Sequence, residues 1–225
     1  MALGAGNVGN GLARRHAARG HDVCLAFSRN RGKLKAGARA VGARPAEPQE
    51  AVAAAEAVVL ATPWTVTEAA LQSPGDLSGK LLWDCTNPLK PEMSGLVIGT
   101  ETCGGELVAA WAGSGARVVK AIPPFAEQMA REGPLILEDG RSPSVFVCGD
   151  DSPARSTVVT LVRDIGAEPI EAGVAAQRPV HRTRRDAAGA PRLSARHGYV
   201  DRPFSIARLS SGGGLAIAFR NPPGA

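Results

Sequence analysis

The sequence of 225 residues predicts an α/β fold, with a doubly wound, mainly parallel sheet and helices on both faces. Two observations predict this fold class. From Met1 to Glu171, short apolar runs rich in Val, Leu and Ile alternate with Ala-rich segments of helical spacing, which is typical of parallel β-α-β units. The apolar runs are also continuous rather than alternating with polar residues, as expected for strands buried on both faces.

The individual elements follow from this alternation. Strands are expected at residues 1–3, 23–27, 57–61, 81–84, 117–122, 144–148 and 168–171, with a weaker one near 39–42. Helices are expected at residues 8–19, 48–55, 66–71, 103–112 and 153–165. Gly20 and Gly166 follow two of these helices as C-terminal stop signals. Asp151 is placed to cap the last helix, with Pro153 in its first turn.

Charge divides the chain into two parts. The net charge is +5 and the pI about 9.4, yet residues 1–173 contain 17 Lys and Arg against 19 Asp and Glu. Residues 174–225 contain nine Arg, no Lys and two Asp. The division predicts one domain over residues 1–173 and an Arg-rich, irregular or disordered tail over 174–225. Because the main body is near neutral, we do not expect a nucleic-acid partner.

Several other classes of protein are not indicated. No stretch approaches the roughly 20 apolar residues that a membrane helix needs, and no signal peptide is evident, so we expect a cytoplasmic protein without a membrane partner. None of the four cysteines lies in a C-x-x-C pair, and at least three suit small buried side chains. The four histidines form no evident group in the sequence, with surface or helix-flank positions favoured, so we expect no metal site.

The strongest motif is a G-x-G-x-x-G at residues 4–9, Gly4-Ala5-Gly6-Asn7-Val8-Gly9. It follows the first strand directly and opens the first helix. In this setting the first glycine allows a tight turn, the second lets the backbone approach a pyrophosphate, and the third lets helix and strand pack closely. The free N–H groups at the helix start then hold the diphosphate. The motif therefore predicts a dinucleotide-binding Rossmann domain, with Gly4, Gly6, Asn7, Val8 and Gly9 at the cofactor.

The end of the second strand indicates NADP(H) rather than NAD(H). NAD enzymes usually place an Asp or Glu there to bind the ribose 2′-hydroxyl. This chain has no carboxylate at that position and continues with Ser28, Arg29 and Lys33. A hydroxyl and a guanidinium can bind a 2′-phosphate, and an ammonium adds a point charge. A solvated basic loop is the alternative interpretation, which the upstream glycine motif makes less favoured.

Three further strand ends carry residues suited to a ligand, because ligands bind outside the carboxyl ends of parallel strands. One end carries Thr62, Pro63 and Trp64, and Trp64 is as well explained by a place in the core. Another carries Thr86 and Asn87, which can hydrogen-bond the nicotinamide ribose or a substrate; for Asn87, before a proline, turn formation is the alternative. The third end is the segment around Ala121.

Together these motifs resemble the coenzyme F420-dependent NADP oxidoreductases. The matching stretches cover about residues 1–173: GAGNVG, FSRNRGK, VVLATPW, DCTNPLKPEMSGL, ARVVKAI and SVFVCGDDSPA. The resemblance implies hydride transfer between NADP(H) and a small-molecule redox carrier, typically the deazaflavin F420. It also implies that the protein mainly positions two rings, so no catalytic acid or base is assigned. A homodimer is left open.

The tail departs from this resemblance. The family continues with apolar helices that help to close the substrate site, where this chain has a basic segment. A disordered tail is one explanation. A frameshifted remnant is another, because a one-base shift across residues 177–194 with GC-rich codons can restore an apolar helix. Loss of those helices leaves two alternatives to an NADPH-dependent oxidoreductase: an NADP(H)-binding module without turnover, and a nucleic-acid-binding protein that uses the tail.

Overall fold

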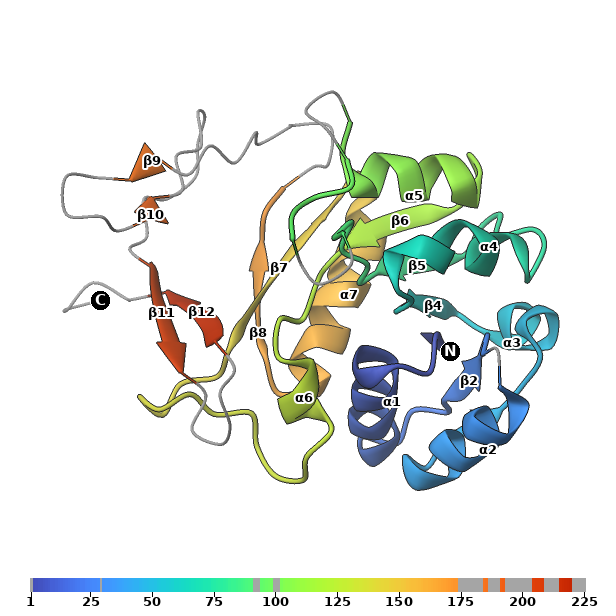
Figure 1. Cartoon of the computed structure of the whole chain (residues 1–225), viewed down its shortest axis with the longest axis horizontal. Coiled ribbons are helices and arrows are strands. Elements are labelled where there is room, and N and C mark those ends of the chain that lie inside the picture. The colour runs from blue at the N-terminus through green and yellow to red at the C-terminus, as the bar shows by residue number, and fades with distance from the viewer. Residues whose placement is uncertain are drawn as a thin grey trace.

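The fold is a single eight-stranded sheet between two layers of helices (Figure 1). The computed structural model describes residues 2–28, 30–90, 94–98 and 102–173, together with four short strands in the C-terminal part. The sheet strands are β1 (Ala2–Leu3), β2 (Cys24–Ala26), β3 (Arg44–Pro45), β4 (Ala57–Leu60), β5 (Leu81–Asp84), β6 (Arg117–Lys120), β7 (Ser144–Gly149) and β8 (Glu168–Glu171). The helices are α1 (Asn7–Ala18), α2 (Arg31–Ala40), α3 (Pro48–Ala54), α4 (Thr67–Gln72), α5 (Gly104–Ala112), α6 (Ala126–Met129) and α7 (Ser152–Asp164), with a short 3-10 turn at Trp64–Val66.

The strand order confirms the predicted α/β class. The order is β3-β2-β1-β4-β5-β6-β7-β8, and all pairs from β3 to β6 are parallel. Strand β7 runs antiparallel to β6, and β8 is parallel to β7. The chain winds outward from β1 to β3 and then restarts on the other side of β1 with β4. In Rossmann folds this reversal opens a crevice at the carboxyl ends of the strands, where a dinucleotide binds.

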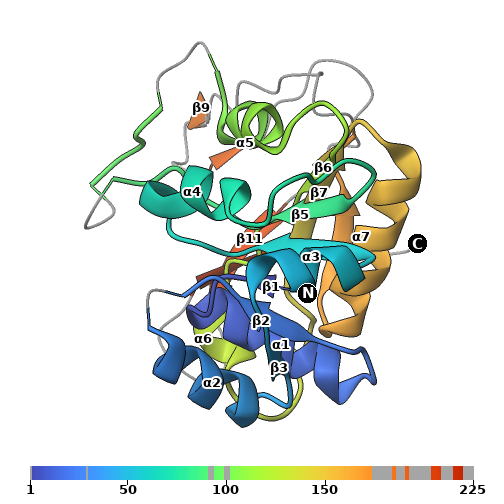
Figure 2. The ribbon, with the colours of Figure 1, turned by 90° about the vertical axis from the view of Figure 1, so that its right-hand side faces the viewer.

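Side chains alternate between the two faces of the sheet and form two hydrophobic cores. Leu25, Val59 and Trp83 point to one face, where they pack with α1, α2, α6 and α7. Val58 and Leu82 point to the other face, where they pack with α3, α4 and α5. Figure 2 shows α4 and α5 on one side of the strands and α1, α2 and α6 on the other. This double burial explains the continuous apolar runs of the sequence.

Three helices on the α1 face end in the same glycine motif. After α1, Gly20 has a φ of 88° and donates its N–H to Ala17 O at 3.0 Å, while His21 donates to His16 O at 3.1 Å. These two bonds define a Schellman motif. Helices α2 and α7 end in the same way at Gly42 and Gly166. The predicted stop signals at Gly20 and Gly166 are therefore confirmed, as is the Asp151 cap, which accepts the Ala154 N–H at 2.7 Å.

Two local predictions were wrong. The weak strand expected near residues 39–42 is not there: helix α2, which was not predicted, covers residues 31–40, and the edge strand β3 follows at Arg44–Pro45. Only Leu34 and Ala38 of this helix are buried, so its apolar stripe is too narrow to stand out in the sequence. The short helix α6 was not predicted either.

The predicted tail, residues 174–225, lies mostly outside the described residues. Within it the structure describes two antiparallel pairs: β9 (Arg184–Arg185) with β10 (Pro191–Arg192), and β11 (Phe204–Arg208) with β12 (Leu215–Phe219).

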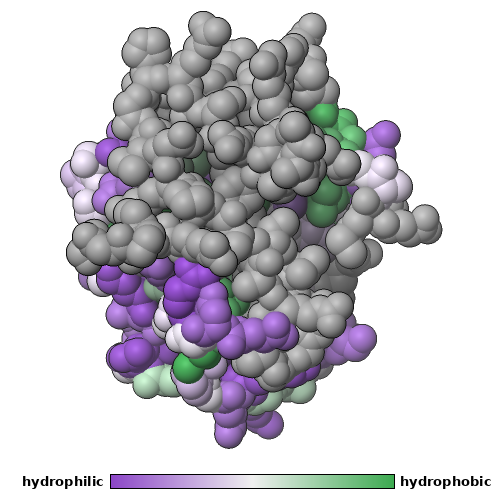
Figure 3. All heavy atoms as spheres, turned by 90° about the vertical axis from the view of Figure 1, so that its left-hand side faces the viewer, coloured by the Kyte–Doolittle hydropathy of each residue, from purple (hydrophilic) through white to green (hydrophobic). Residues whose placement is uncertain are grey.

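On the face drawn in Figure 3, the described surface at the lower end is mainly hydrophilic. Among the described residues, every helix is too short or too polar to span a bilayer.

Candidate functional site

The candidate site begins with the glycine turn between β1 and α1, beside the point where the strand order reverses. Gly4 has a φ of 105°, a conformation that side-chain-bearing residues rarely adopt. Its N–H donates to Ala26 O at 3.0 Å. A Cβ at this position would lie 2.5 Å from Ala61 O. Gly4 is therefore held between the ends of β2 and β4, where no larger residue fits.

Gly6 and Gly9 have opposite surroundings. A Cβ on Gly9 would lie 1.9 Å from Gly4 O, so the helix backbone touches the turn that precedes it. A Cβ on Gly6 would meet no atom within 4 Å. The first contact makes Gly9 a packing residue. The open space at Gly6 is a cradle that a ligand's pyrophosphate can enter, as the motif predicts.

The start of α1 is suited to an anion. Its N-cap residue, Gly6, has no side chain to cap the helix, and the first turn contains no acidic residue. The first N–H groups of a helix have no intrahelical acceptor and carry the positive end of the helix dipole. Asn10 steadies the turn by donating from Nδ2 to Ala5 O at 2.8 Å. Asn7 is exposed beside the cradle, whereas Val8 packs partly against the core.

The predicted 2′-phosphate loop lies at the end of β2 and leads into α2. Phe27 has a φ of 60°, which turns the chain sharply at the end of the strand. The Ser28 hydroxyl accepts the N–H of Asn30 at 3.2 Å, and Asn30 in turn caps α2 by accepting the Lys33 N–H at 2.9 Å. The Lys33 side chain is on an exposed position. Arg29 lies outside the described residues. The start of a second helix thus lies next to the predicted phosphate-binding residues.

The end of β4 places its three candidates differently. Thr62 is buried, and its hydroxyl is hydrogen-bonded to the hydroxyl of Thr67 at 3.1 Å. Pro63 is exposed. Trp64 is half-buried against Trp111 of α5, with ring centroids 5.2 Å apart. Among these three, only Pro63 and the exposed part of Trp64 can border a ligand with their side chains.

The ends of β5 and β6 hold a buried ion pair that the sequence analysis missed. Asp84 is fully buried, and its Oδ2 lies 2.8 Å from Lys120 Nζ. Its Oδ1 accepts the Thr86 N–H at 2.8 Å and the Thr86 hydroxyl at 2.7 Å. Lys120 also donates to the Thr86 carbonyl oxygen. The signal in the sequence is one acid and one base at the last positions of two parallel strands, which the sheet register places opposite one another.

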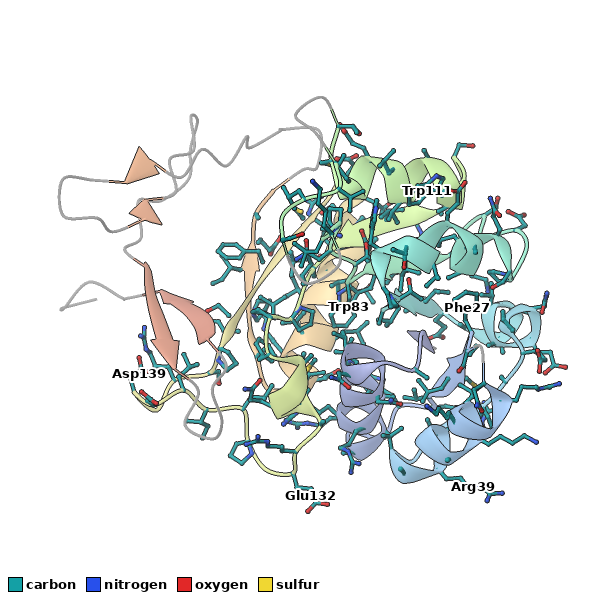
Figure 4. All side chains as sticks on the ribbon, viewed as in Figure 1. Phe27, Arg39, Trp83, Trp111, Glu132 and Asp139 are labelled. Atoms are coloured by element: carbon teal, nitrogen blue, oxygen red, sulfur yellow. The ribbon has the colours of Figure 1, made fainter. Side chains whose placement is uncertain are left out.

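Two of the predicted cofactor residues are buried beside this ion pair. The Thr86 side chain is 1% exposed and is committed to Asp84, so it is not free to contact a ligand. Ala121 is also buried, and its N–H donates to Asp84 O while its carbonyl accepts Trp83 Nε1 at 2.7 Å. Trp83 itself lies in the middle of the molecule (Figure 4). Asn87 is exposed and remains available.

The buried thiols next to this edge of the sheet are poor nucleophiles. Burial raises the pKa of Cys85 well above its usual value, and the adjacent Asp84 raises it further. Burial also raises the pKa of Cys148. Nucleophilic cysteine chemistry needs the thiolate, which burial disfavours at both positions. Neither thiol is therefore suited to act as a nucleophile in covalent catalysis.

The fold and the glycine turn together define a dinucleotide-binding oxidoreductase domain of the NAD(P)-dependent class. Residues 2–88 match the model of the family described as NADP oxidoreductase, coenzyme F420-dependent. This match includes the glycine turn, the predicted 2′-phosphate loop and the ends of β4 and β5. The resemblance predicted from the sequence is confirmed over these residues.

Solved structures show the same fold over most of the chain. A hypothetical protein from Sinorhizobium meliloti is 26% identical, with a TM-score of 0.69 over 86% of this chain and 94% of that one. A protein described as a candidate F420-dependent NADP-reductase, from Arthrobacter sp. FB24, is 28% identical, with a TM-score of 0.64 over 77% and 83%. A reductive aminase from Aspergillus terreus in complex with NADPH is 19% identical, with a TM-score of 0.58 over 78% and 55%, which shows a shared fold alone.

Substitutions at Gly6 and Gly9 should separate binding from folding. Gly6→Ala should change the free energy of unfolding by no more than about 1 kcal/mol, because the new methyl group meets no atom. It should weaken NADPH binding at least roughly tenfold, since the methyl group fills the pyrophosphate cradle. Gly9→Ala should instead lower the free energy of unfolding by more than about 2 kcal/mol. Urea unfolding and NADPH titration measure the two effects; equal effects of both variants on stability would contradict this division.

The Asp84–Lys120 pair provides a second prediction. Lys120→Met should cost about 3–5 kcal/mol of unfolding free energy, because Asp84 is left buried without its counter-charge. The double variant Asp84→Asn, Lys120→Met should recover a large part of that loss, since no charge is then buried. Urea unfolding followed by circular dichroism measures both. A double variant no more stable than Lys120→Met would show that the loss does not come from the unpaired carboxylate.

Proposed function

We propose that this chain transfers a hydride between NADP(H) and a second redox carrier, a deazaflavin of the F420 type. The observation that carries the proposal is the open cradle at Gly6, beside the uncapped start of α1. It fits a pyrophosphate, and the family match extends across it. The partner in this proposal is a small molecule rather than a nucleic acid or a membrane.

The choice of NADP(H) over NAD(H) is supported by the end of β2. The strand ends in Ala26 and is followed by Phe27 and Ser28, so no carboxylate stands where NAD enzymes bind the ribose 2′-hydroxyl. A carboxylate there would also repel a 2′-phosphate. Ser28, the start of α2 and the exposed Lys33 side chain instead present donors and positive charge. We propose that Arg29 completes this phosphate site.

The choice of F420 as the carrier is supported by the names of similar proteins. The matching family is described as coenzyme F420-dependent, and the Arthrobacter protein as an F420-dependent NADP-reductase. Reduction of such a carrier takes up one hydride and one proton, and water can supply the proton. The transfer therefore needs no acid or base from the described edge of the sheet. There Lys120 is engaged by Asp84 and Thr86, and burial keeps Cys85 and Cys148 protonated. The role left to the protein is to position two rings.

The cofactor assignment predicts a selective loss in Arg29→Ala. Removing a guanidinium–phosphate pair should cost roughly 1.5–3 kcal/mol, or about one to two decades in NADPH affinity. Affinity for NADH should stay unchanged because NADH has no 2′-phosphate. Arg39→Ala is the matched control, since Arg39 projects from the far end of α2 (Figure 4). Fluorescence titrations of the three proteins measure these affinities, and an equal loss for both nucleotides would argue against a phosphate contact.

The carrier is tested by NADPH oxidation with F420, with a free flavin and a cyclic imine as alternative acceptors. We expect turnover with F420 that is lost in Gly6→Ala and retained in Arg39→Ala. Turnover with the imine alone would assign the chain to another reductase type. NADPH that binds but is oxidised by no acceptor would instead identify a binding module without turnover.

A further inference from the structure

A group of polar side chains lies at the opposite end of α1 from the nucleotide cradle. It consists of His16 in the last turn of α1, His21 just after that helix, and Asp164, the last residue of α7. Helices α1 and α7 pack into the same hydrophobic core on one face of the sheet, and their ends are joined by a contact between His21 Nε2 and Asp164 Oδ2 at 2.9 Å. The expectation that the histidines form no group was therefore wrong for His16 and His21.

The two histidines are brought together by the helix stop. In the Schellman motif after α1, His16 lies three residues before the C-cap residue Arg19, and His21 lies two residues after it. Side chains at these two positions characteristically contact each other. The ring centroids are 5.2 Å apart in an edge-to-face arrangement. A helix end that usually closes with an apolar contact here closes with two imidazoles.

His16 has no hydrogen-bond partner among the described residues. Its side chain is 6% exposed, and both Nδ1 and Nε2 are buried without a partner. A buried polar group in this state loses its hydration without compensation, which costs about 1–3 kcal/mol. Its ring lies beside His21 and Asp164 with neither nitrogen engaged by a described residue, so one of them can serve as a ligand atom.

The electrostatic surroundings favour a cation. Asp164 lies at the C-terminal end of α7, and His16 at the C-terminal end of α1, where the negative ends of both helix dipoles meet. A carboxylate at such a position is unfavourable unless a positive charge compensates it. Arg15, next to His16 in the sequence, is engaged by the carbonyl oxygens of Ile165, Gln128, Arg131 and Gly133. Its guanidinium donates to carbonyl oxygens at the ends of these helices and loops and makes no hydrogen bond to the ring nitrogens of His16.

We propose that His16, His21 and Asp164 bind one divalent transition-metal ion, best matched by Zn²⁺, that joins the end of α1 to the end of α7. One ligand atom from each of the three side chains lies within 4.8 Å of the other two. Tetrahedral zinc with bonds of about 2.0–2.1 Å holds its ligands about 3.3 Å apart. His21 and Asp164 are 40% and 29% exposed, so both can rotate by the small amount required. Water completes the coordination from the exposed side.

The position of the proposed site argues for a structural role, because it is far from the nucleotide cradle. Helix α1 has 12 residues, so about 18 Å separates this end from the nucleotide cradle. A metal here cannot touch a bound cofactor. It satisfies the orphan nitrogen of His16 and cross-links two helices that are far apart in the sequence. The expected consequence is greater stability of the helix that carries the pyrophosphate cradle.

The test uses the full-length protein, with any purification tag removed and metal stripped by a chelator. Zn²⁺ is added in competition with a fluorescent chelator, and thermal unfolding is recorded with and without the ion. We expect one Zn²⁺ per chain and a higher unfolding temperature in its presence. His21→Ala and Asp164→Asn should each weaken binding at least roughly tenfold and abolish the thermal shift. Both positions are partly exposed, so these variants should fold.

The control variant removes other side chains of the chain whose chemistry allows them to bind zinc. The variant Cys103→Ser, His181→Ala, His197→Ala lacks an exposed thiol and the two remaining histidines of the chain. It should bind Zn²⁺ as the wild type does. The absence of stoichiometric binding by the wild type would overturn the proposal. So would binding that persists in His21→Ala and Asp164→Asn but disappears in the control variant.

Discussion

The contact between the Gly4 carbonyl oxygen and the backbone of Gly9 is the constraint on which the rest of the structure depends. Any side chain at residue 9 would place its Cβ 1.9 Å from that oxygen. Because the contact is so close, α1 starts directly at the end of β1, at the point where the strand order reverses. The same turn is anchored by Gly4 between Ala26 and Ala61, which belong to the ends of β2 and β4. The location of the anion cradle at Gly6 is thus a consequence of backbone packing.

Helix α1 has two ends of opposite electrostatic character, and the structure treats them differently. Its N-terminal end is left uncapped at the nucleotide cradle, where a bound pyrophosphate can compensate the positive dipole. Its C-terminal end lies next to the end of α7, where Arg15 donates to the Ile165 carbonyl and His16 meets His21 and Asp164. Packing at the second end helps to fix the position of the whole helix, including the glycine turn about 18 Å away.

The carboxyl edge of the sheet is held by charge rather than by apolar packing alone. The Asp84–Lys120 pair joins the last residues of β5 and β6 and also fixes Thr86. A buried ion pair contributes little net stability compared with apolar residues, but it strongly penalises arrangements that separate the two charges. At this edge it fixes the loop that ends in the exposed Asn87. Such rigidity suits the proposed hydride transfer, which requires two rings to be placed precisely relative to each other.

The sequence by itself determined the features that depend on neighbours along the chain. The glycine turn, the Asp151 cap and the helix stops at Gly20 and Gly166 are local interactions, and the continuous apolar runs follow from burial on both faces of the sheet. Tertiary structure decided what depends on partners distant in the sequence. Helix α2 owes its stability to packing of Leu34 and Ala38 against the core near α1, and the antiparallel direction of β7 depends on its pairing with β6.

The same distinction applies to the candidate sites. The cradle at Gly6 could be predicted because all of its backbone belongs to one short segment. The buried state of Thr86 could not be predicted from the sequence. Its hydroxyl donates to the carboxylate of Asp84, and that carboxylate can be buried because Lys120 from another strand pairs with it. The pairing of His16 with His21 is local and was within reach of the sequence, through the stop at Gly20. Only the folded structure could bring Asp164 to them, because 143 residues separate it from His21.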